Sequence, residues 1–171
     1  MDKNLKLYQY AKTCIGKNKA PLLKTLGCVE ALSAVFREAL GEELGENAST
    51  YRLYLLLEKD VRFEELSYPV LGCLVISPTG FGNGSIRGHI GIVSDSEKIM
   101  SNNSDLLLFD EHYTLKTWRE RYVELGGMPM SFFKLKNEEQ IETEVIKKKI
   151  DLLTKLVLLW QEVLRLLKLK Q

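Results

Sequence analysis

Apolar residues recur at helical spacing in the first third of the chain. Helices are predicted from Leu5 to Cys14, from about Cys28 to Gly41, and from a cap at Ser49 or Thr50 to Leu57. A fourth helix, capped by Thr114, is expected to end at Gly126. The pattern therefore predicts that helices come first and form much of the core.

Short apolar runs in the middle of the chain predict strands instead. Gly72–Ser77 is β-branched and ends at Pro78, and three further strands are expected at His89–Val93, Lys98–Asn102 and Met130–Leu135. Residues 79–88 contain four glycines and are interpreted as a loop at the rim of a cleft. Helices followed by a small antiparallel sheet predict the α+β class.

The residues after Asn137 follow a different pattern. Apolar residues alternate four and three apart, which is a heptad seam: Ile146, Ile150, Leu153, Val157, Trp160, Leu164 and Leu167. We expect a first domain over 1–137 and an amphipathic, leucine-rich helix over 138–171. Self-association into a homo-oligomer is the favoured role of this helix. Contact with a membrane surface and docking on the first domain remain open.

Composition excludes several classes. The 171 residues are 45% hydrophobic and 27% charged, which is typical of a globular chain. A net charge of +1 gives no sign of nucleic-acid binding. Three cysteines without metal-like spacing indicate neither a disulfide framework nor a zinc site, so no metal or cofactor is expected. The N-terminus lacks an apolar signal core, and synthesis in the cytoplasm is expected.

Cys28 is the first candidate for chemistry. It follows Gly27 and opens an apolar helix, where free backbone N–H groups and the helix dipole favour a thiolate. A single cysteine on such a helix can equally be a small buried hydrophobe. Cys14 and Cys73 are interpreted in that structural sense.

His89 supplies the base that a nucleophilic cysteine needs. It lies 61 positions after Cys28, at the start of a predicted strand. Gly88 and Gly91 beside it are expected to let a neighbouring helix approach closely. A nucleophile at a helix N-terminus with a base on an adjacent strand is the cysteine–histidine arrangement. The other histidine, His112, is interpreted as a surface residue.

A third polar group should hold the second ring nitrogen of His89. The next strand offers Ser101, Asn102 and Asn103. Strand alternation places Ser101 and Asn103 on one side. Asn103 is therefore the first choice, and Asn102, from the opposite face, is the second.

The segments Gly27-Cys28-Val29-Glu30 and Gly88-His89-Ile90-Gly91-Ile92-Val93 together resemble the CHAP family of cysteine, histidine-dependent amidohydrolases and peptidases. The resemblance covers roughly Leu5 to Leu135. It implies a papain-like fold, with Cys28 as nucleophile, His89 as base and a polar orienting residue on the next strand. It further implies cleavage of an amide bond in peptidoglycan, as in bacteriophage lysins.

Three features depart from that family's pattern. Cys73 stands where such domains often have an aspartate. Ser101 and Asn103 stand where many members have a glutamate and an asparagine. The leucine-rich tail replaces any recognisable cell-wall-binding module.

The predicted function is that of a peptidoglycan hydrolase, either an endopeptidase or an N-acetylmuramoyl-alanine amidase, which acts at the cell wall once released. Cys28 would attack an amide carbonyl, and water would resolve the thioester. Two alternatives stay open. One is a non-catalytic scaffold for oligomerisation or partner binding, and the other is a cytoplasmic cysteine deamidase or isopeptidase.

Overall fold

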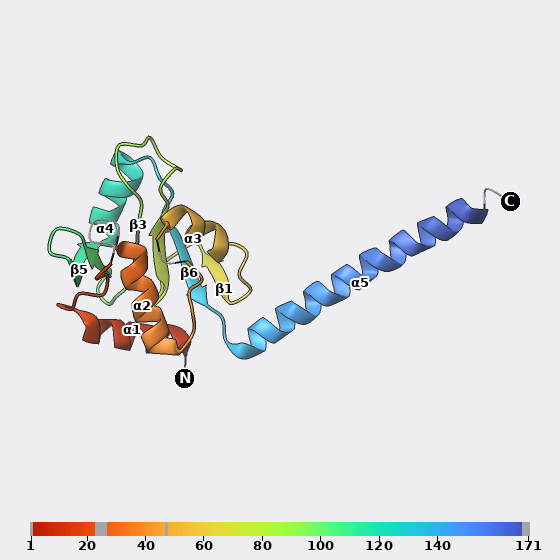
Figure 1. Cartoon of the computed structure of the whole chain (residues 1–171), viewed down its shortest axis with the longest axis horizontal. Coiled ribbons are helices and arrows are strands. Elements are labelled where there is room, and N and C mark those ends of the chain that lie inside the picture. The colour runs from red at the N-terminus through yellow and green to blue at the C-terminus, as the bar shows by residue number, and fades with distance from the viewer. Residues whose placement is uncertain (1, 23–26, 47, 169–171) are drawn as a thin grey trace. The chain divides into compact units, whose positions relative to one another are not determined.

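The computed structural model describes residues 2–22, 27–46 and 48–168. The chain divides into two compact units, residues 1–135 and 136–171 (Figure 1). Leu26, which precedes the Gly27-Cys28 motif, and the side chain of Leu167 lie outside the described part. The six strands of the described residues all belong to the first unit.

Three helices cover one face of the sheet. They are α1 (Lys3–Cys14), α2 (Cys28–Leu40) and α3 (Thr50–Leu57), and they confirm the three N-terminal helices predicted from the spacing of apolar residues. Asp2 caps α1 by accepting hydrogen bonds from the backbone N–H groups of Asn4 and Leu5. Gly41 ends α2 in the left-handed conformation, with a φ of 73°.

The sheet has six strands in the order β1-β6-β2-β3-β4-β5, and every neighbouring pair is antiparallel. The four predicted strands are confirmed as β2 (Leu74–Ser77), β3 (His89–Val93), β4 (Lys98–Asn103) and β6 (Ser131–Leu135). The other two, β1 (Phe63–Leu66) and β5 (Leu108–Thr114), were not predicted. Both are edge strands that carry charged residues, so their alternation is weak.

Two hydrophobic clusters pack on the two faces of the sheet. Leu74, Ile76, Ile90 and other residues of one face form a core with α1, α2 and α3. Val75, Val93 and Ile99 face the opposite way and pack against Trp118 and Tyr122, which follow β5. Trp118, Phe132 and Phe133 are buried. The α+β class predicted from the sequence is therefore confirmed.

The helix predicted after Thr114 is present but changes its geometry midway. Thr114 and Thr117 form a capping box for α4 (Leu115–Trp118). The chain continues as a π-helix, η1 (Arg119–Leu125), and ends before Gly127. π-Helical turns are rare and occur frequently at functional sites.

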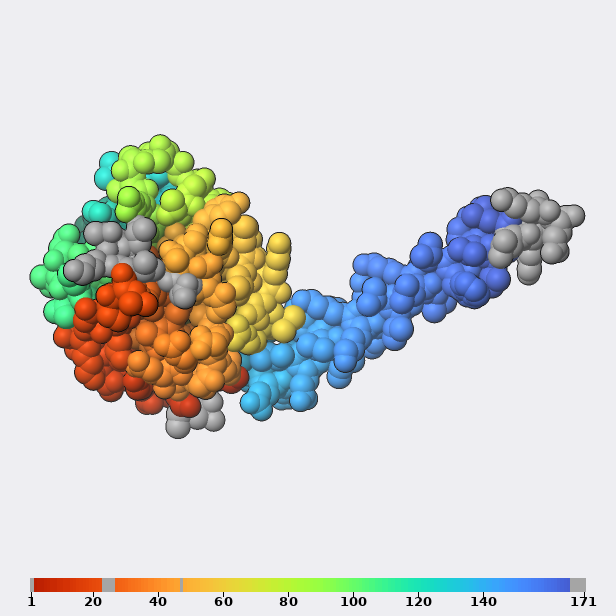
Figure 2. Space-filling model, viewed as in Figure 1, coloured from red at the N-terminus to blue at the C-terminus, as the bar shows by residue number. Residues whose placement is uncertain are grey.

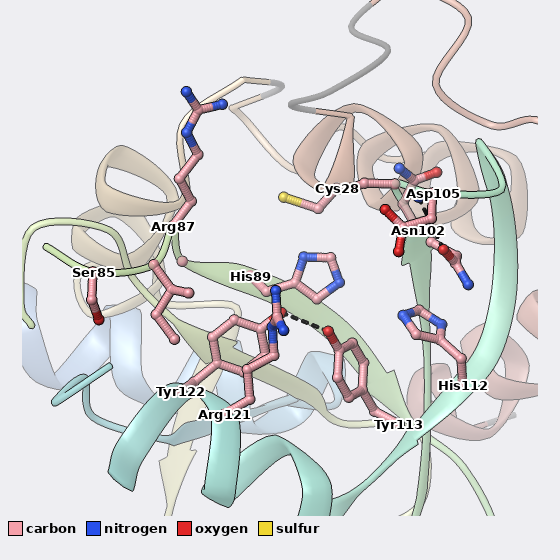
Figure 3. Close-up of a pocket in the computed structure, with 14 residues that line it drawn as sticks. Cys28, Ser85, Arg87, His89, Asn102, Asp105, His112, Tyr113, Arg121 and Tyr122 are labelled. Carbon is pink, nitrogen blue, oxygen red and sulfur yellow. Dashed lines mark hydrogen bonds between the residues drawn. The ribbon is translucent and has the colours of Figure 1, made fainter. Parts of the chain in front are cut away.

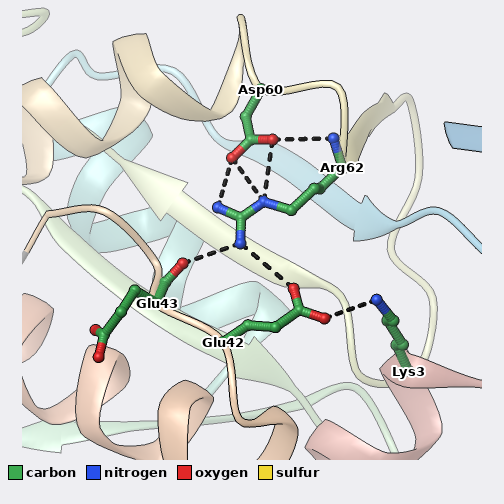
Figure 4. A network of polar contacts seen from close by, with 5 residues as sticks. All are labelled: Lys3, Glu42, Glu43, Asp60 and Arg62. Carbon is green, nitrogen blue, oxygen red and sulfur yellow. Dashed lines mark hydrogen bonds and ion pairs between the residues drawn. The ribbon is translucent and has the colours of Figure 1, made fainter. Parts of the chain in front are cut away.

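Polar contacts close the first unit at its ends. The side-chain amide of Asn4 donates to the carbonyl of Leu135 and accepts from its N–H, both at 2.9 Å. Arg62 donates to both carboxylate oxygens of Asp60, with a shortest contact of 2.6 Å, and also reaches Glu42 at 3.4 Å (Figure 4). Lys3 binds the same Glu42 at 2.7 Å. This network joins α1, through Lys3, to Glu42 before α3 and to Arg62 after α3.

The second unit is built on a 31-residue helix, α5 (Glu138–Lys168). The apolar seam predicted from the sequence therefore lies on one continuous helix. Ion pairs between Asp151 and Lys155 and between Glu162 and Arg165 link successive turns. Among the described residues, no helix is both long and apolar enough to cross a membrane.

Candidate active site

A pocket of about 420 Å³ opens where β3 begins and β4 ends. Its walls come from five parts of the chain, which are far apart in sequence (Figure 3): Cys28; Ser85 to His89; Asn102 to Asp105; His112 and Tyr113; Arg121 and Tyr122. The loop between β2 and β3 contributes Ser85 to Gly88, in agreement with the prediction that residues 79–88 form a loop at the rim of a cleft. In the space-filling view this loop, in yellow-green, lies at the surface beside the chain near Gly126 (Figure 2), where Asn83 donates to the Gly126 carbonyl.

Cys28 is the first residue of α2 and is half-buried. Gly27 is the N-cap residue of this helix, and because it has no side chain it forms no side-chain cap with the first N–H groups. Burial raises the pKa of the Cys28 thiol to about 11, and backbone hydrogen bonds from Val29 and Ile90 only partly oppose it. The N–H groups at the helix start therefore act in the predicted direction, but burial outweighs them and the net shift favours the neutral thiol.

His89 is held in a defined orientation at the start of β3. Its Nε2 lies 3.0 Å from the hydroxyl oxygen of Ser101, and the residue is only 7% exposed. The imidazole packs among the rings of Tyr113, Trp118 and Tyr122, with centroid distances of 5.3 to 5.8 Å. Burial lowers the pKa of His89 to about 3, and the charges of His112 and Arg121 act in the same direction. The ring is neutral at pH 7.

Two glycines fix the path of β3, although not for the predicted reason. A Cβ at Gly88 would lie 2.3 Å from the carbonyl oxygen of Ser77, and one at Gly91 would lie 2.8 Å from that of Met100. Neighbouring strands, and not a helix, therefore approach these glycines. The prediction of a close helix is wrong because β2 and β4 flank β3 in the sheet.

Cys28 and His89 share the pocket but do not form a hydrogen bond with each other in the described structure. Cys28 belongs to the helix layer on one face, whereas the His89 ring packs against Trp118 and Tyr122 on the other. Both groups are uncharged at neutral pH. Catalytic hydrogen bonds are often long in unliganded enzymes and tighten in the substrate complex. The pocket thus holds the thiol and the imidazole that the sequence predicts as nucleophile and base, without a hydrogen bond between them.

The two asparagines proposed to orient His89 do not do so here. Asn103 instead accepts hydrogen bonds from the backbone N–H groups of Asp105 and Leu106, and so shapes the turn after β4. Because side chains alternate along β4, Asn102 lies on the face of the sheet that carries Met100 and α2, and Ser101 lies on the opposite face. Ser101 pairs with Gly91 across the sheet and points the same way as His89, which explains its contact with Nε2.

Asn102 is nevertheless unusual. It lines the pocket, is only 2% exposed, and has no hydrogen-bond partner at either Oδ1 or Nδ2. Buried amides are nearly always paired, because an unpaired polar group is costly to desolvate. Its burial thus needs a reason beyond packing.

Several pocket residues were not predicted from the sequence, and irregular backbone geometry brings four of them to the pocket. His112 and Tyr113 are consecutive, yet both line the pocket, because β5 contains a bulge at which Glu111 and His112 lie opposite Met100. Arg121 and Tyr122 reach the pocket from the π-helix. Neither irregularity leaves a periodic signal in the sequence. Within the described ranges, no group of three or more metal-binding side chains is present.

Comparisons with known proteins place the fold. No family model matches the chain, and no curated protein matches it. Among solved structures, it is similar to a chain of the type VI native effector–immunity complex Tae3–Tai3 from Ralstonia pickettii, with a TM-score of 0.52 and 16% identity. The match covers 78% of this chain and 98% of that chain. At this identity the likeness is one of fold, so it supports the α+β architecture and leaves the CHAP resemblance a prediction.

Proposed function

We propose that residues 1–135 form a cysteine-dependent hydrolase that cleaves an amide bond of peptidoglycan. The observation that carries this proposal is the shared pocket of Cys28, at a helix N-terminus, and His89, whose Nε2 is held by Ser101 at 3.0 Å. Nucleophile, base and orienting group are thus present in the roles that acyl transfer needs.

The reaction proceeds by two acyl transfers. His89 takes the Sγ proton as the sulfur of Cys28 attacks the carbonyl carbon, and it returns the proton to the leaving nitrogen as the C–N bond breaks. Water then attacks the thioester, which releases a carboxylic acid and restores the thiol. The backbone N–H of Cys28 stabilises the oxyanion.

One likeness supports peptidoglycan as the substrate, namely that of the Cys28 and His89 motifs to the CHAP family. The similar fold of a chain from a bacterial effector–immunity complex supports a bacterial setting. We infer that the protein acts at the bacterial cell wall. The bond cleaved is either a peptide bond of the stem or cross-bridge, or the link between sugar and peptide.

Digestion of purified peptidoglycan tests the proposal. Wild-type protein should release fragments whose masses identify the bond, and Cys28→Ser and His89→Gln should each lower the rate by at least about 10³-fold. Cys14→Ala, a change at a buried cysteine outside the pocket, is the matched control. A Cys28→Ser variant that digests peptidoglycan at the wild-type rate would overturn the mechanism. Intact peptidoglycan together with an altered glutamine or isopeptide bond in a protein would instead indicate a deamidase or isopeptidase.

We also infer that α5 associates with other copies of this chain. Ile150, Leu153, Val157 and Trp160 lie four and three residues apart on one continuous helix, so they fall on one side of it. A parallel or antiparallel partner helix with the same seam would bury these side chains. The ion pairs between turns lie among the polar positions, where they remain solvated.

A further inference from the structure

We propose that Arg121 binds a carboxylate of the substrate beside the scissile amide, and that the pocket therefore selects acidic amides over neutral ones. The inference rests on the proposed function of the pocket, which it deepens by naming the substrate class.

The π-helix puts Arg121 on the pocket wall. The N–H of Gly126 donates to the carbonyl of Arg121 at 3.1 Å, which is the wide turn of this helix. As a result Arg121 and Tyr122, although consecutive, both line the pocket, where they lie beside His89 and Tyr113 (Figure 3). Arg87 also lines the pocket, but its side chain points away from His89 in the same view.

The charge of Arg121 has no carboxylate counterpart among the described residues. Its guanidinium carbon lies 5.7 Å from the ring centroid of Tyr122, so an aromatic face supports it. Asp105, on another wall of the pocket, is not within ion-pair distance. Arg62 shows the contrasting structural case, with Asp60 and Glu42 both within 4.0 Å (Figure 4). The planar fork of an arginine matches a carboxylate, and Arg121 has that fork available.

The same charge acts on the proposed base. Burial is the main cause of the low pKa of His89 and of His112, and Arg121 adds to it, because a nearby cation disfavours a second positive charge. A carboxylate bound to Arg121 would offset this cation and make His89 more basic. An acidic substrate would thus be bound and would also strengthen the group that accepts the thiol proton.

A matched pair of substrates tests this role. The two probes are synthetic peptidoglycan stem-peptide fragments that differ in one group, a free carboxylate or a carboxamide next to the scissile amide. Wild-type protein should hydrolyse the carboxylate form with a kcat/KM about 10- to 100-fold higher. Arg121→Gln should bring the ratio to within about twofold, whereas Arg121→Lys should keep part of it, since a lysine retains the charge but not the fork.

Arg119→Gln is the control, because Arg119 lies on the same π-helix but does not line the pocket. It should keep the wild-type ratio. An unchanged ratio in Arg121→Gln, or no preference in the wild type, would overturn the proposal.

A binding measurement separates this proposal from the proposed function. Calorimetric titration of both fragments into Cys28→Ser, and into Cys28→Ser combined with Arg121→Gln, needs no turnover. Preferential binding of the carboxylate form that depends on Arg121, together with a wild-type protein that hydrolyses neither fragment, would support the carboxylate site and reject the hydrolase. If the wild type hydrolyses the fragments but both variants bind the carboxylate and carboxamide forms equally, the hydrolase is supported and the carboxylate site is rejected.

Discussion

Two opposing effects act on the Cys28 thiol at the start of α2. The free N–H groups of the first turn favour a thiolate, while the surrounding apolar core favours the neutral thiol, and burial is the larger effect. No such competition acts on His89, because burial and the charges of His112 and Arg121 all lower its pKa. The thiol and the imidazole are therefore both neutral, and the proposed mechanism requires that substrate binding bring about the proton transfer.

The buried state of His89 predicts a pH-dependent stability. Its pKa is about 3 in the folded protein and about 6.5 when unfolded, so protons bind the unfolded chain preferentially between these values. The free energy of unfolding should fall by roughly 1.4 kcal/mol for each pH unit below 6.5. Urea denaturation at pH 7 and pH 5 should show a loss about 2 kcal/mol larger in the wild type than in His89→Gln. Equal losses in the two proteins would contradict the burial of a neutral imidazole.

Asn102 predicts a gain in stability on substitution. Both polar atoms of its amide are buried without a partner. Replacing it by leucine, which is similar in size, should raise the free energy of unfolding by about 1–3 kcal/mol. Asn103→Leu is the control, and it should lower stability because Asn103 caps the next turn through two backbone N–H groups. A loss of stability in Asn102→Leu, measured by urea denaturation, would show that the amide is satisfied in solution.

At the scale of elements, the start of β3 is the most constrained segment of the site. Gly88→Ala would place a Cβ 2.2 Å from the backbone nitrogen of Thr79 and 2.3 Å from the carbonyl of Ser77. Because backbone atoms cannot move aside, the variant should lose about 1–3 kcal/mol of stability. The displaced His89 should also lose its contact with Ser101, and hydrolysis with it. Arg87→Ala, one residue earlier and exposed, should leave thermal denaturation unchanged, and an equally stable Gly88→Ala would contradict the close packing.

Elements with a regular pattern could be predicted from the sequence, and irregular ones could not. The helices α1, α2 and α3 and the four inner strands follow simple periods of apolar residues. The edge strand β1 has only four residues, and β5 is bulged, so alternation does not identify either one. The site divides in the same way. Cys28 and His89 stand in recognisable local motifs. Strand register brings Ser101 to His89, whereas a bulge and a π-helix bring His112 and Arg121 to the pocket.

At the scale of the whole molecule, the two units should separate in function. A chain that ends at Asn137 retains the complete sheet and both hydrophobic clusters. Light scattering should show it as a monomer under conditions where the full chain is an oligomer, because only the seam of α5 drives association. Val157→Asp in the full chain should have the same effect. An oligomeric truncated protein, or a monomeric full chain that binds anionic vesicles, would contradict self-association through α5.

The clamp between Asn4 and Leu135 has a consequence for how the first unit could be rebuilt. Its two hydrogen bonds, each 2.9 Å long, hold the beginning and the end of this unit side by side. A short glycine–serine linker could therefore join residue 135 to residue 2, and new termini could be opened in the exposed β3–β4 turn at Ser96-Glu97. Such a circular permutant would keep every strand neighbour, but β4, β5 and β6 would be synthesised before the linker, and the segment that carries both Cys28 and His89 would be made last.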